Sequence, residues 1–473
     1  MDRIVKTVDG ASVSLSSEVL AGLAAGLRGT LSFPGDARYE DARTIWNAMI
    51  DKRPAAIVHA AGASDVIQTV RLAAQHGLLL SVKGGGHNIA GSAVCEGGLM
   101  LDLSAMRSVR IDPKARTAHV EPGNKLSDFD TEAQAFGLAT PLGINSTTGV
   151  AGLTVGGGFG WLSRKHGLTI DNLRSADVVT ATGELIRASD ENHPDLFWAI
   201  RGGGGNFGVV TSFEFKLHPV GPQVTAGLIV HPFSDAKRVL GEYRRLVAQA
   251  PDELCCWAVI RKAPPLPFLP PEVHGTEVLV LALCHTGDLA AGEKTAAPFK
   301  AIGKPIADVV GPVPYAAWQQ AFDPLLTAGE RNYWKSHDFV ELGDPLIDVL
   351  LQAVRHLPSP QCEIFVASLG GAINRVPVAA TAYPHRDVQF VVNVHTRWSL
   401  PAEDQACIGW ARGLYDAAAP FATGGVYVNF MPSDETQRVR SGAYGPNYDR
   451  LAKIKATYDP RNLFRMNQNV VPA

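Results

Sequence analysis

The chain has 473 residues, 46% of them hydrophobic and 19% charged, a length that exceeds one ordinary core and predicts two or three domains. Its 43 Lys and Arg are balanced by 46 Asp and Glu, for a formal net charge of -3. This balance excludes an electrostatically obvious nucleic-acid binder and argues against a polybasic membrane-surface protein. No apolar run approaches the roughly 20 residues that span a bilayer, so no membrane partner is expected.

The first half of the chain alternates short apolar runs with helical patterns. A short helix is expected at 17–27, and a second one begins at Ser64 and Asp65, with Val66, Val70 and Ala73 on one face. Strands are predicted at 55–60, 78–82, 99–103, 109–112 and 117–121, followed by a helix at 126–136, a hairpin at 176–182 and 184–188, and a helical turn at 196–201.

The composition changes near 220–222, where the glycine clusters of the first half stop. Beyond it, a helix is predicted at 236–248, strands at 277–284, 363–367 and 388–397, and a last helix that Asp459 and Pro460 end. Such an order favours a separate α+β domain. A proline-rich stretch at 263–271 is expected to be a surface loop.

The six cysteines are scattered and none belongs to a CxxC pair. This spacing argues against a disulfide framework and against a zinc site, so no metal is expected. The first ten residues carry Asp2, Arg3, Lys6 and Asp9 and do not resemble a signal peptide. We therefore expect a cytoplasmic protein with free thiols.

Glycine is the unusual feature of the composition, with 47 residues and three clusters in the first half of the chain. The clusters are KGGGHN at 83–88, GVAGLTVGGGFG at 149–160 and RGGGGNFG at 201–208. Glycine lets a backbone take positive φ and approach a ligand closely, and successive N–H groups can cradle an anion. Three such clusters predict a large phosphate-bearing cofactor. A P-loop is excluded by the absence of its lysine motif. A Rossmann unit is disfavoured because it needs a strand before the fingerprint-like glycines at 156–160, whereas the segment 145–150 is polar and turn-like.

The order of these motifs resembles the flavin-linked oxidases of the vanillyl-alcohol oxidase, or PCMH, type, and within them the berberine-bridge-enzyme-like branch with its bacterial 6-hydroxy-nicotine-oxidase-like members. The matching stretches are RPAAIV at 53–58, SVKGGGHN at 81–88, TGVAGLTVGGGFGWLSRKHGLTIDN at 148–172, DLFWAIRGGGGNFGVVT at 195–211, HR at 385–386 and YDPRNLFRMNQN at 458–469. The resemblance covers nearly the whole chain in order.

This resemblance implies an α+β fold with FAD as cofactor. It implies an FAD-binding domain of two subdomains at 1–220, a substrate domain at 221–414 whose antiparallel sheet is backed by helices, and a segment at 415–473 that returns to the FAD domain. The residues that it assigns to the flavin are Val82, Lys83, Gly84, Gly85, Gly86, His87, Asn88, Ser92, Thr148, Gly149, Gly152, Gly157, Gly158, Asn172, Gly208, Val209, Asn467 and Asn469.

His87 occupies the position at which family members bond an imidazole covalently to the 8α-methyl carbon of the flavin. A neutral imidazole nitrogen is a nucleophile, which suits that chemistry. Many relatives add a second bond from a cysteine, whose position here is Asn145, so a single covalent link is expected. A family position that gates oxygen falls on Thr148, which favours an oxidase over a dehydrogenase.

The usual catalytic bases of the family are missing. The position of the common tyrosine is Phe430, and a second family position, usually glutamate, falls near Val391. Residues two apart on a strand share a face, so His395 lies on the face of Val391 and is the first candidate base, with a packing role as the alternative. Further candidates are Tyr427 and Asn429, then Glu363, and a polar-aromatic group at Tyr333, Lys335 and His337 that either lines or roofs a pocket.

We therefore expect an FAD-linked oxidase that takes hydride from an alcohol or amine carbon of a small aromatic or heterocyclic molecule, with O2 as the second substrate. The absent tyrosine shifts the expectation toward amines or heteroaromatic substrates, because an amine in its neutral form donates hydride with less need of a strong base. Two alternatives remain open at this point: a flavin dehydrogenase that uses another acceptor, and a flavin-binding protein without turnover.

Overall fold

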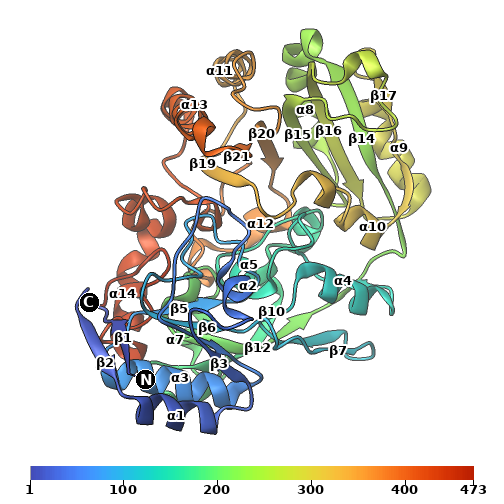
Figure 1. The fold of residues 1–473 in the computed structure, drawn as a ribbon. Helices are drawn as coiled ribbons and strands as arrows, with labels where there is room; N and C mark the ends of the chain where they lie inside the picture. Colours follow the sequence, from blue (N-terminus) through green and yellow to red (C-terminus); the bar gives the residue numbers. More distant parts are fainter. Residues whose placement is uncertain (1) are drawn as a thin grey trace.

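A four-stranded sheet near the N-terminus forms the first layer of the computed structural model, which describes residues 2–473 (Figure 1). Its strand order is β3-β4-β6-β5; β4 and β5 run parallel to β6, and β3 runs antiparallel to β4. Strands β4 and β6 are buried at every position, as expected for apolar strands covered on both faces. The elements of this part are β1 (Arg3–Lys6), β2 (Ser12–Leu15), α1 (Ser17–Gly26), β3 (Thr30–Ser32), α2 (Tyr39–Arg43), β4 (Ala56–His59), α3 (Ala63–His76), β5 (Leu80–Lys83) and β6 (Leu99–Asp102).

A five-stranded antiparallel sheet of order β11-β10-β12-β8-β7 forms the second layer. Helices α4 and α7 pack on it, and the C-terminal helix α14 lies against α7, so the end of the chain completes this core. The elements are β7 (Val109–Asp112), β8 (Thr117–Val120), α4 (Leu126–Gln134), β9 (Leu138–Ala139), α5 (Val150–Val155), α6 (Ser163–His166), β10 (Leu173–Val179), β11 (Leu185–Ser189), α7 (Pro194–Ile200), β12 (Val209–Lys216), β13 (His218–Pro219) and α14 (Tyr448–Tyr458).

The third layer is a large antiparallel sheet of order β17-β14-β16-β15-β20-β21-β19, with β18 paired to β14 (Figure 1). Five of its strands, β14, β15, β16, β19 and β21, have nine or ten residues, whereas the longest strand of the first half has eight. The elements are β14 (Gln223–Pro232), α8 (Ala236–Gln249), β15 (Leu254–Lys262), β16 (Glu277–His285), α9 (Leu289–Lys300), β17 (Ala307–Asp308), β18 (Gly311–Pro314), α10 (Tyr315–Gln319), β19 (Arg331–Phe339), α11 (Asp344–Val354), β20 (Glu363–Ser368), α12 (Ala372–Arg375), β21 (Phe390–Trp398) and α13 (Asp404–Ala418).

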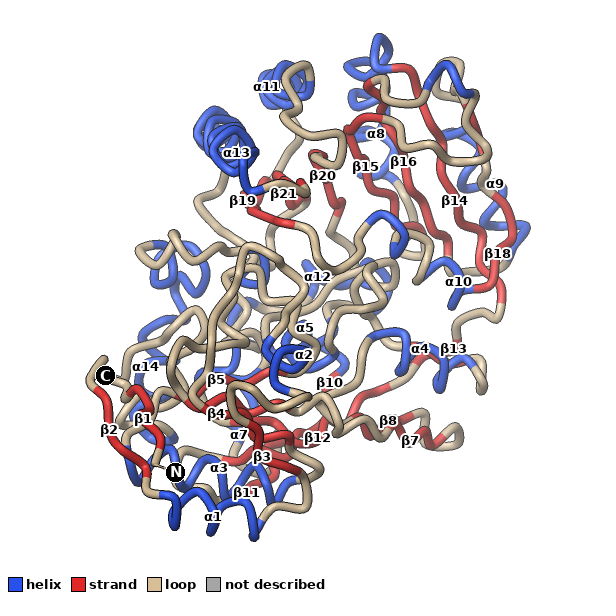
Figure 2. The backbone as a smooth tube through the Cα atoms, in the orientation of Figure 1, coloured by secondary structure: helices blue, strands red, loops and turns tan. Residues whose placement is uncertain are grey.

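The two faces of this large sheet belong to different cores. Alternate residues such as Cys256, Ile364 and Val392 pack with helices α8, α11 and α13, whereas Trp257 and Phe365 belong to a core that includes Phe159 and Trp161 from the first half of the chain. Helices therefore cover one face of the large sheet, and the other face is turned toward the first two layers. Loops occupy much of the space between the large sheet and these two layers (Figure 2).

The predicted domain boundaries remain predictions, but the positions of the elements bear on them. The proposed change at 220/221 falls in the short connection between β13 and β14. The proposed change at 414/415 falls inside α13, which continues to Ala418 on the helix-backed face of the large sheet. A domain boundary inside a packed helix would divide one packed element between two domains. We therefore place the point at which the chain returns to the FAD-binding half after α13.

The six cysteines are free and buried. Among residues 2–473, no helix combines the length and apolarity that a bilayer crossing requires. Within the same range, no three His, Cys, Asp or Glu side chains are grouped to hold a metal ion.

Candidate active site

An elongated cavity lies between the glycine clusters and the inner face of the large sheet. All three glycine clusters contribute to its wall, together with the turn that contains Trp46, the segment 427–430 and the C-terminal residues 464–468. Strands β15, β19, β20 and β21 close it on the opposite side. The cavity therefore joins parts of the chain that are more than 400 residues apart in sequence.

The first and second glycine clusters touch backbone to backbone at one end of this cavity. A Cβ atom added to Gly85 would overlap the backbone of Gly149, and one added to Gly149 would overlap Gly85, so both positions require glycine. Gly86 follows with φ of 72°, a conformation that side-chain-bearing residues rarely adopt. This turn places His87 three glycines after the end of β5.

His87 is held by three neighbours beside the cavity. Trp46 stacks on its ring, with centroids 5.0 Å apart, while the Thr147 hydroxyl lies 3.0 Å from Nε2 and the Thr148 hydroxyl lies 3.4 Å from Nδ1. Burial, reinforced by the charge of Lys125, lowers the pKa of His87 to about 3. The imidazole is therefore neutral at physiological pH, which is the nucleophilic form.

Most residues assigned to the flavin from the sequence are brought together at this cavity. The Asn467 Oδ1 atom is buried without a hydrogen-bond partner in the protein, which leaves it free for a ligand. Those that line the wall are Val82, Gly84, Gly85, Gly86, His87, Asn88, Ser92, Thr148, Gly149, Gly152, Gly208, Val209 and Asn467.

Five of the assigned residues lie outside this wall. Lys83 donates its ammonium to the Ala42 carbonyl at 2.6 Å, and Asn172 donates its amide to two carbonyls while its oxygen meets His218. These contacts give both residues a structural role. The other three assigned residues outside the wall are Gly157 and Gly158, which adopt φ of 127° and 75°, and Asn469.

The opposite side of the cavity is built by one row of residues across four strands. In register, Trp334 of β19 lies opposite His395 of β21, His395 opposite Glu363 of β20, and Glu363 opposite Arg261 of β15. Trp334, His395 and Glu363 line the cavity. The predicted face of β21 is thus observed, since Asn393 also lines the cavity, although Val391 does not.

His395 is oriented by Glu363. Its Nδ1 atom lies 3.0 Å from Glu363 Oε1, while the other carboxylate oxygen lies 2.6 Å from Arg261 Nη1. Burial raises the pKa of Glu363, but Arg261 and His395 outweigh it and bring this pKa to about 2. The ionised carboxylate accepts a hydrogen bond from Nδ1–H, and the tautomer that donates there carries its lone pair on Nε2. Nε2 is buried and has no partner among residues 2–473.

The segment Tyr427–Phe430 brings two of the candidate residues together. Residues 428–430 form a single helical turn, and the side chains of Tyr427 and Asn429 contact each other. The Tyr427 oxygen accepts hydrogen bonds from Asn429 Nδ2 and from the Gly158 amide, each at 2.9 Å. Burial raises the pKa of Tyr427 to about 12, which makes this phenol a donor and a poor base.

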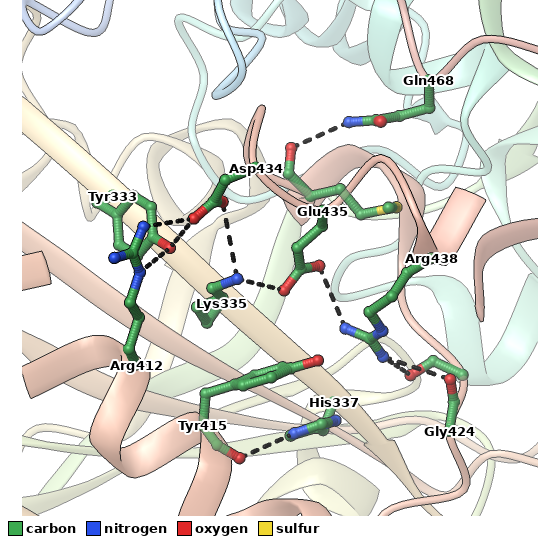
Figure 3. A network of polar contacts seen from close by, with 12 residues as sticks. Tyr333, Lys335, His337, Arg412, Tyr415, Gly424, Asp434, Glu435, Arg438 and Gln468 are labelled. Atoms are coloured by element: carbon green, nitrogen blue, oxygen red, sulfur yellow. Dashed lines mark hydrogen bonds and ion pairs between the residues drawn. The ribbon is translucent and has the colours of Figure 1, made fainter. Parts of the chain in front are cut away.

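The prediction that Tyr333, Lys335 and His337 line or roof a pocket is not supported by their placement. Alternation along β19 turns them away from the cavity, onto the face covered by α13, while Trp334 between them points inward. There Lys335 Nζ meets Glu435 Oε1 at 2.7 Å, and the Tyr333 hydroxyl donates to Asp434 Oδ2 at 2.7 Å (Figure 3).

Several cavity residues were missed by the sequence reasoning. Trp46 and Trp334 frame the His87 end, with rings 5.7 Å apart, and Trp257 and Phe365 lie further along the same wall. Aromatic residues without a motif give no signal in a single sequence. The alternation of β19 could have identified Trp334, because the residues on either side of it are polar.

Comparison with known proteins decides the family. A model described as "FAD binding domain" matches residues 54–189, and one described as "Berberine and berberine like" matches residues 426–471. The (R)-6-hydroxynicotine oxidase of Paenarthrobacter nicotinovorans is 31% identical over 94% of this chain and 97% of its own. The chain belongs to the berberine-like family of FAD-linked oxidases. The uncharacterised FAD-linked oxidoreductase YgaK of Bacillus subtilis is 30% identical, with 94% and 97% covered.

Solved structures of this berberine-like family share the fold. The 6-hydroxy-D-nicotine oxidase from Arthrobacter nicotinovorans superposes with a TM-score of 0.84 at 28% identity, covering 94% of this chain and 98% of that one. The xylooligosaccharide oxidase from Myceliophthora thermophila gives 0.84 at 25% identity, covering 96% and 99%. The PCMH-type α+β fold expected from the sequence is therefore confirmed.

The residues of the cavity fit FAD. A Cβ added to the cavity-lining Gly152 or Gly205 would meet no protein atom within 4 Å, glycine N–H groups suit a pyrophosphate, and the unpartnered Asn467 oxygen suits a polar edge. His87 stands at the junction between this glycine-lined part and the aromatic part of the cavity.

Proposed function

We propose that this berberine-like protein is an oxidase that removes a hydride from an alcohol or amine carbon of a small aromatic or heterocyclic molecule, with O2 as the final acceptor. The observation that carries the proposal is one continuous cavity with His87 on its glycine-lined side and His395 on its aromatic side. FAD, when bound, supplies a two-electron acceptor for the hydride. A cytoplasmic location, in keeping with six free thiols, is part of the proposal.

We propose covalent attachment of the flavin through His87 alone. Its support is the neutral imidazole, fixed by the Trp46 ring and by the Thr147 and Thr148 hydroxyls. Asn145, at the family position of a second linkage, also lines the cavity but carries an amide, which is no nucleophile. The proposed bond joins an imidazole nitrogen to the 8α-carbon of the flavin.

On the aromatic side, His395 accepts the substrate's proton at Nε2, and Glu363 holds the ring in the tautomer that this requires. Tyr427 keeps its proton and serves as a hydrogen-bond donor, with Asn429 fixing the phenol. Trp46, Trp334 and Phe430 exclude water from the reacting centre. Related proteins act on 6-hydroxynicotine and on xylooligosaccharides, and the aromatic wall favours a flat molecule of the first kind.

Acid denaturation of the purified protein tests the attachment. We expect the yellow colour to stay with the precipitated wild-type protein and to be released from His87→Ala. His59→Ala, at a buried histidine remote from the cavity wall, is the control and should keep its colour on the protein. Release of colour from the wild type would refute the covalent link, and a colourless protein despite flavin supply would refute the oxidase itself.

A further inference from the structure

The aromatic side of the cavity has an unusual charge inventory. Among the described residues 2–473, Glu363 is the only carboxylate on the cavity wall, and no Lys or Arg side chain belongs to that wall. His87 is neutral there. Whether the site attracts a cation, an anion or a neutral group is therefore decided by the surroundings of Glu363.

The charge of Glu363 is already balanced. Arg261 lies 2.6 Å from its Oε2, and both side chains are almost completely buried. The Arg397 guanidinium on β21 adds a second positive field at the carboxylate and also helps to lower its pKa. Hydrogen bonds to Gln361 and Thr327 hold the Arg397 side chain in this position, and the negative charge of Glu330 stabilises the guanidinium.

The polar atoms that remain free on this wall suit a neutral group. His395 Nε2, Asn393 Oδ1 and Trp334 Nε1 are buried and without hydrogen-bond partners. His395 and Asn393 lie two positions apart on β21 and are 6% and 3% exposed, so both present their free atoms to the cavity. Two acceptors and one indole donor can satisfy a hydroxyl, whereas an ammonium would require a counter-charge.

We propose that the group oxidised at this site is a neutral hydroxyl and not an amine, with His395 as proton acceptor, Glu363 as its positioning residue and Arg261 as the fixed counter-charge that keeps cations out. This proposal rests on the proposed function and narrows it. It reverses the expectation drawn from the missing tyrosine, because the row Trp334–His395–Glu363–Arg261 supplies the base that an alcohol needs.

The chemistry balances with groups already named. The C–H bond of the carbinol breaks and its electron pair leaves with the hydrogen as hydride to the oxidised flavin. The O–H proton moves to His395 Nε2, and the C–O single bond becomes C=O. The Glu363 carboxylate stabilises the resulting imidazolium through Nδ1–H. O2 is the oxidant that takes up the two electrons afterwards.

A matched pair of ligands without a transferable hydrogen isolates binding from turnover. We suggest 2-phenyl-2-propanol and the amine of the same shape, 2-phenyl-2-propylamine, titrated into the holoenzyme by calorimetry. We expect the alcohol to bind at least tenfold more tightly at pH 7. The difference should shrink as the pH rises and the amine becomes neutral. Equal or tighter binding of the amine at pH 7, or no binding of either ligand, would overturn the proposal.

Variants of Arg261 provide the decisive test. Arg261→Met leaves Glu363 without its arginine partner, so we expect the amine to bind more tightly than the alcohol in this variant. Arg261→Lys should keep the wild-type order of the two affinities, with the alcohol binding more tightly. Glu363→Gln, which retains the cation, covers the case in which Arg261→Met fails to fold. It should weaken amine binding further and leave alcohol binding within about threefold. An unchanged order in Arg261→Met, or tighter amine binding in Glu363→Gln, would overturn the proposal.

These outcomes are separable from those of the proposed function. If the protein is yellow and the colour survives acid, a preference for the amine refutes only the choice of a hydroxyl. If the protein is colourless with flavin supplied, the oxidase proposal fails whatever the order of the two ligands.

Discussion

Glu363 and His395 face each other in register on β20 and β21, with Oε1 and Nδ1 3.0 Å apart. Arg261 holds the other carboxylate oxygen from β15. The arrangement fixes the imidazole tautomer from behind and leaves Nε2 as the only free atom of the ring that can accept a proton. The same logic orients histidines in acyl-transfer enzymes, where a buried carboxylate fixes the ring that acts as base.

Replacement of His395 should reduce catalysis without affecting the flavin. We expect His395→Gln to slow flavin reduction by about 10²- to 10⁴-fold, the range that a positioned general base contributes. Anaerobic stopped-flow bleaching of the flavin measures this step. Glu363→Gln should shift the pH profile of that rate and leave it partly active. A reduction rate in His395→Gln within threefold of wild type would mean that the histidine only packs against Trp334.

Thr148 tests the second half of the reaction. It lines the cavity beside His87, and the family resemblance predicts that the residue at this position gates oxygen. Thr148→Leu adds bulk at this point and should slow reoxidation of the reduced protein by O2 at least tenfold, with little effect on flavin reduction. Mixing reduced protein with oxygenated buffer in a stopped-flow instrument measures the rate. Thr148→Val, nearly the same size, should reoxidise like the wild type, and an unaffected rate in Thr148→Leu would exclude the gate.

The ion pair of Lys335 and Glu435 connects the large sheet to the C-terminal segment (Figure 3). Both side chains are buried, and the Lys335 ammonium also lies over the Tyr415 ring. Removing one member of a buried pair costs about 3–5 kcal/mol because a charge remains without its partner. Arg438 still contacts Glu435 at 3.2 Å, which places Lys335→Met near the lower end.

Denaturant unfolding of Lys335→Met measures this loss. Arg412→Met is its control, because Arg412 binds Asp434 in the same network but is largely exposed, and such surface pairs contribute about 1 kcal/mol or less. We expect the control to stay close to wild type. If both variants lose the same small amount, the buried pair is no stronger than the exposed one.

Two half-buried histidines should make the protein less stable in mild acid. Burial lowers the pKa of His166 to about 4 and of His218 to about 3, and their rings stack 3.8 Å apart, so neither accepts a proton easily in the folded state. Unfolding restores a pKa near 6.5 and takes up protons. The stability that the two neutral histidines contribute to the folded state is therefore fully present above pH 6.5 and is lost as the pH falls toward 3.

Urea midpoints between pH 7.5 and pH 4.5 measure this dependence. A double variant with His166→Gln and His218→Gln should show a flatter decline than the wild type. His356→Gln changes an exposed histidine and serves as the control, with an expected decline like that of the wild type. An unaltered slope in the double variant would assign the acid sensitivity to other groups.

The flavin-binding half could be anticipated from the sequence to a large extent. The strands expected around 55–60, 78–82 and 99–103 and the helix expected at 126–136 lie within a few residues of those observed. The three glycine clusters meet at one cavity as expected. The sequence reveals these clusters because a position whose backbone lies against another backbone, such as Gly85 against Gly149, requires glycine at that very position.

The sequence indicates the site of the substrate half only in part. Alternation along its strand identifies His395, whereas Glu363 is a weaker candidate, and Arg261 and Trp334 belong to no recognisable motif. At Tyr333, Lys335 and His337, polarity suggested a pocket, whereas these side chains form a buried network on the helix-backed face.

Ordered glycine motifs and turn requirements identify the family, the cofactor class and the position of His87, because neighbouring residues carry them. Only the folded chain shows which side chains form one row with His395 and which charge is balanced. Arg261, Trp334, Glu363 and His395 come from four strands, and their alignment depends on strand register across the sheet. Register is set by the packing of both sheet faces, which no local pattern in a single strand records.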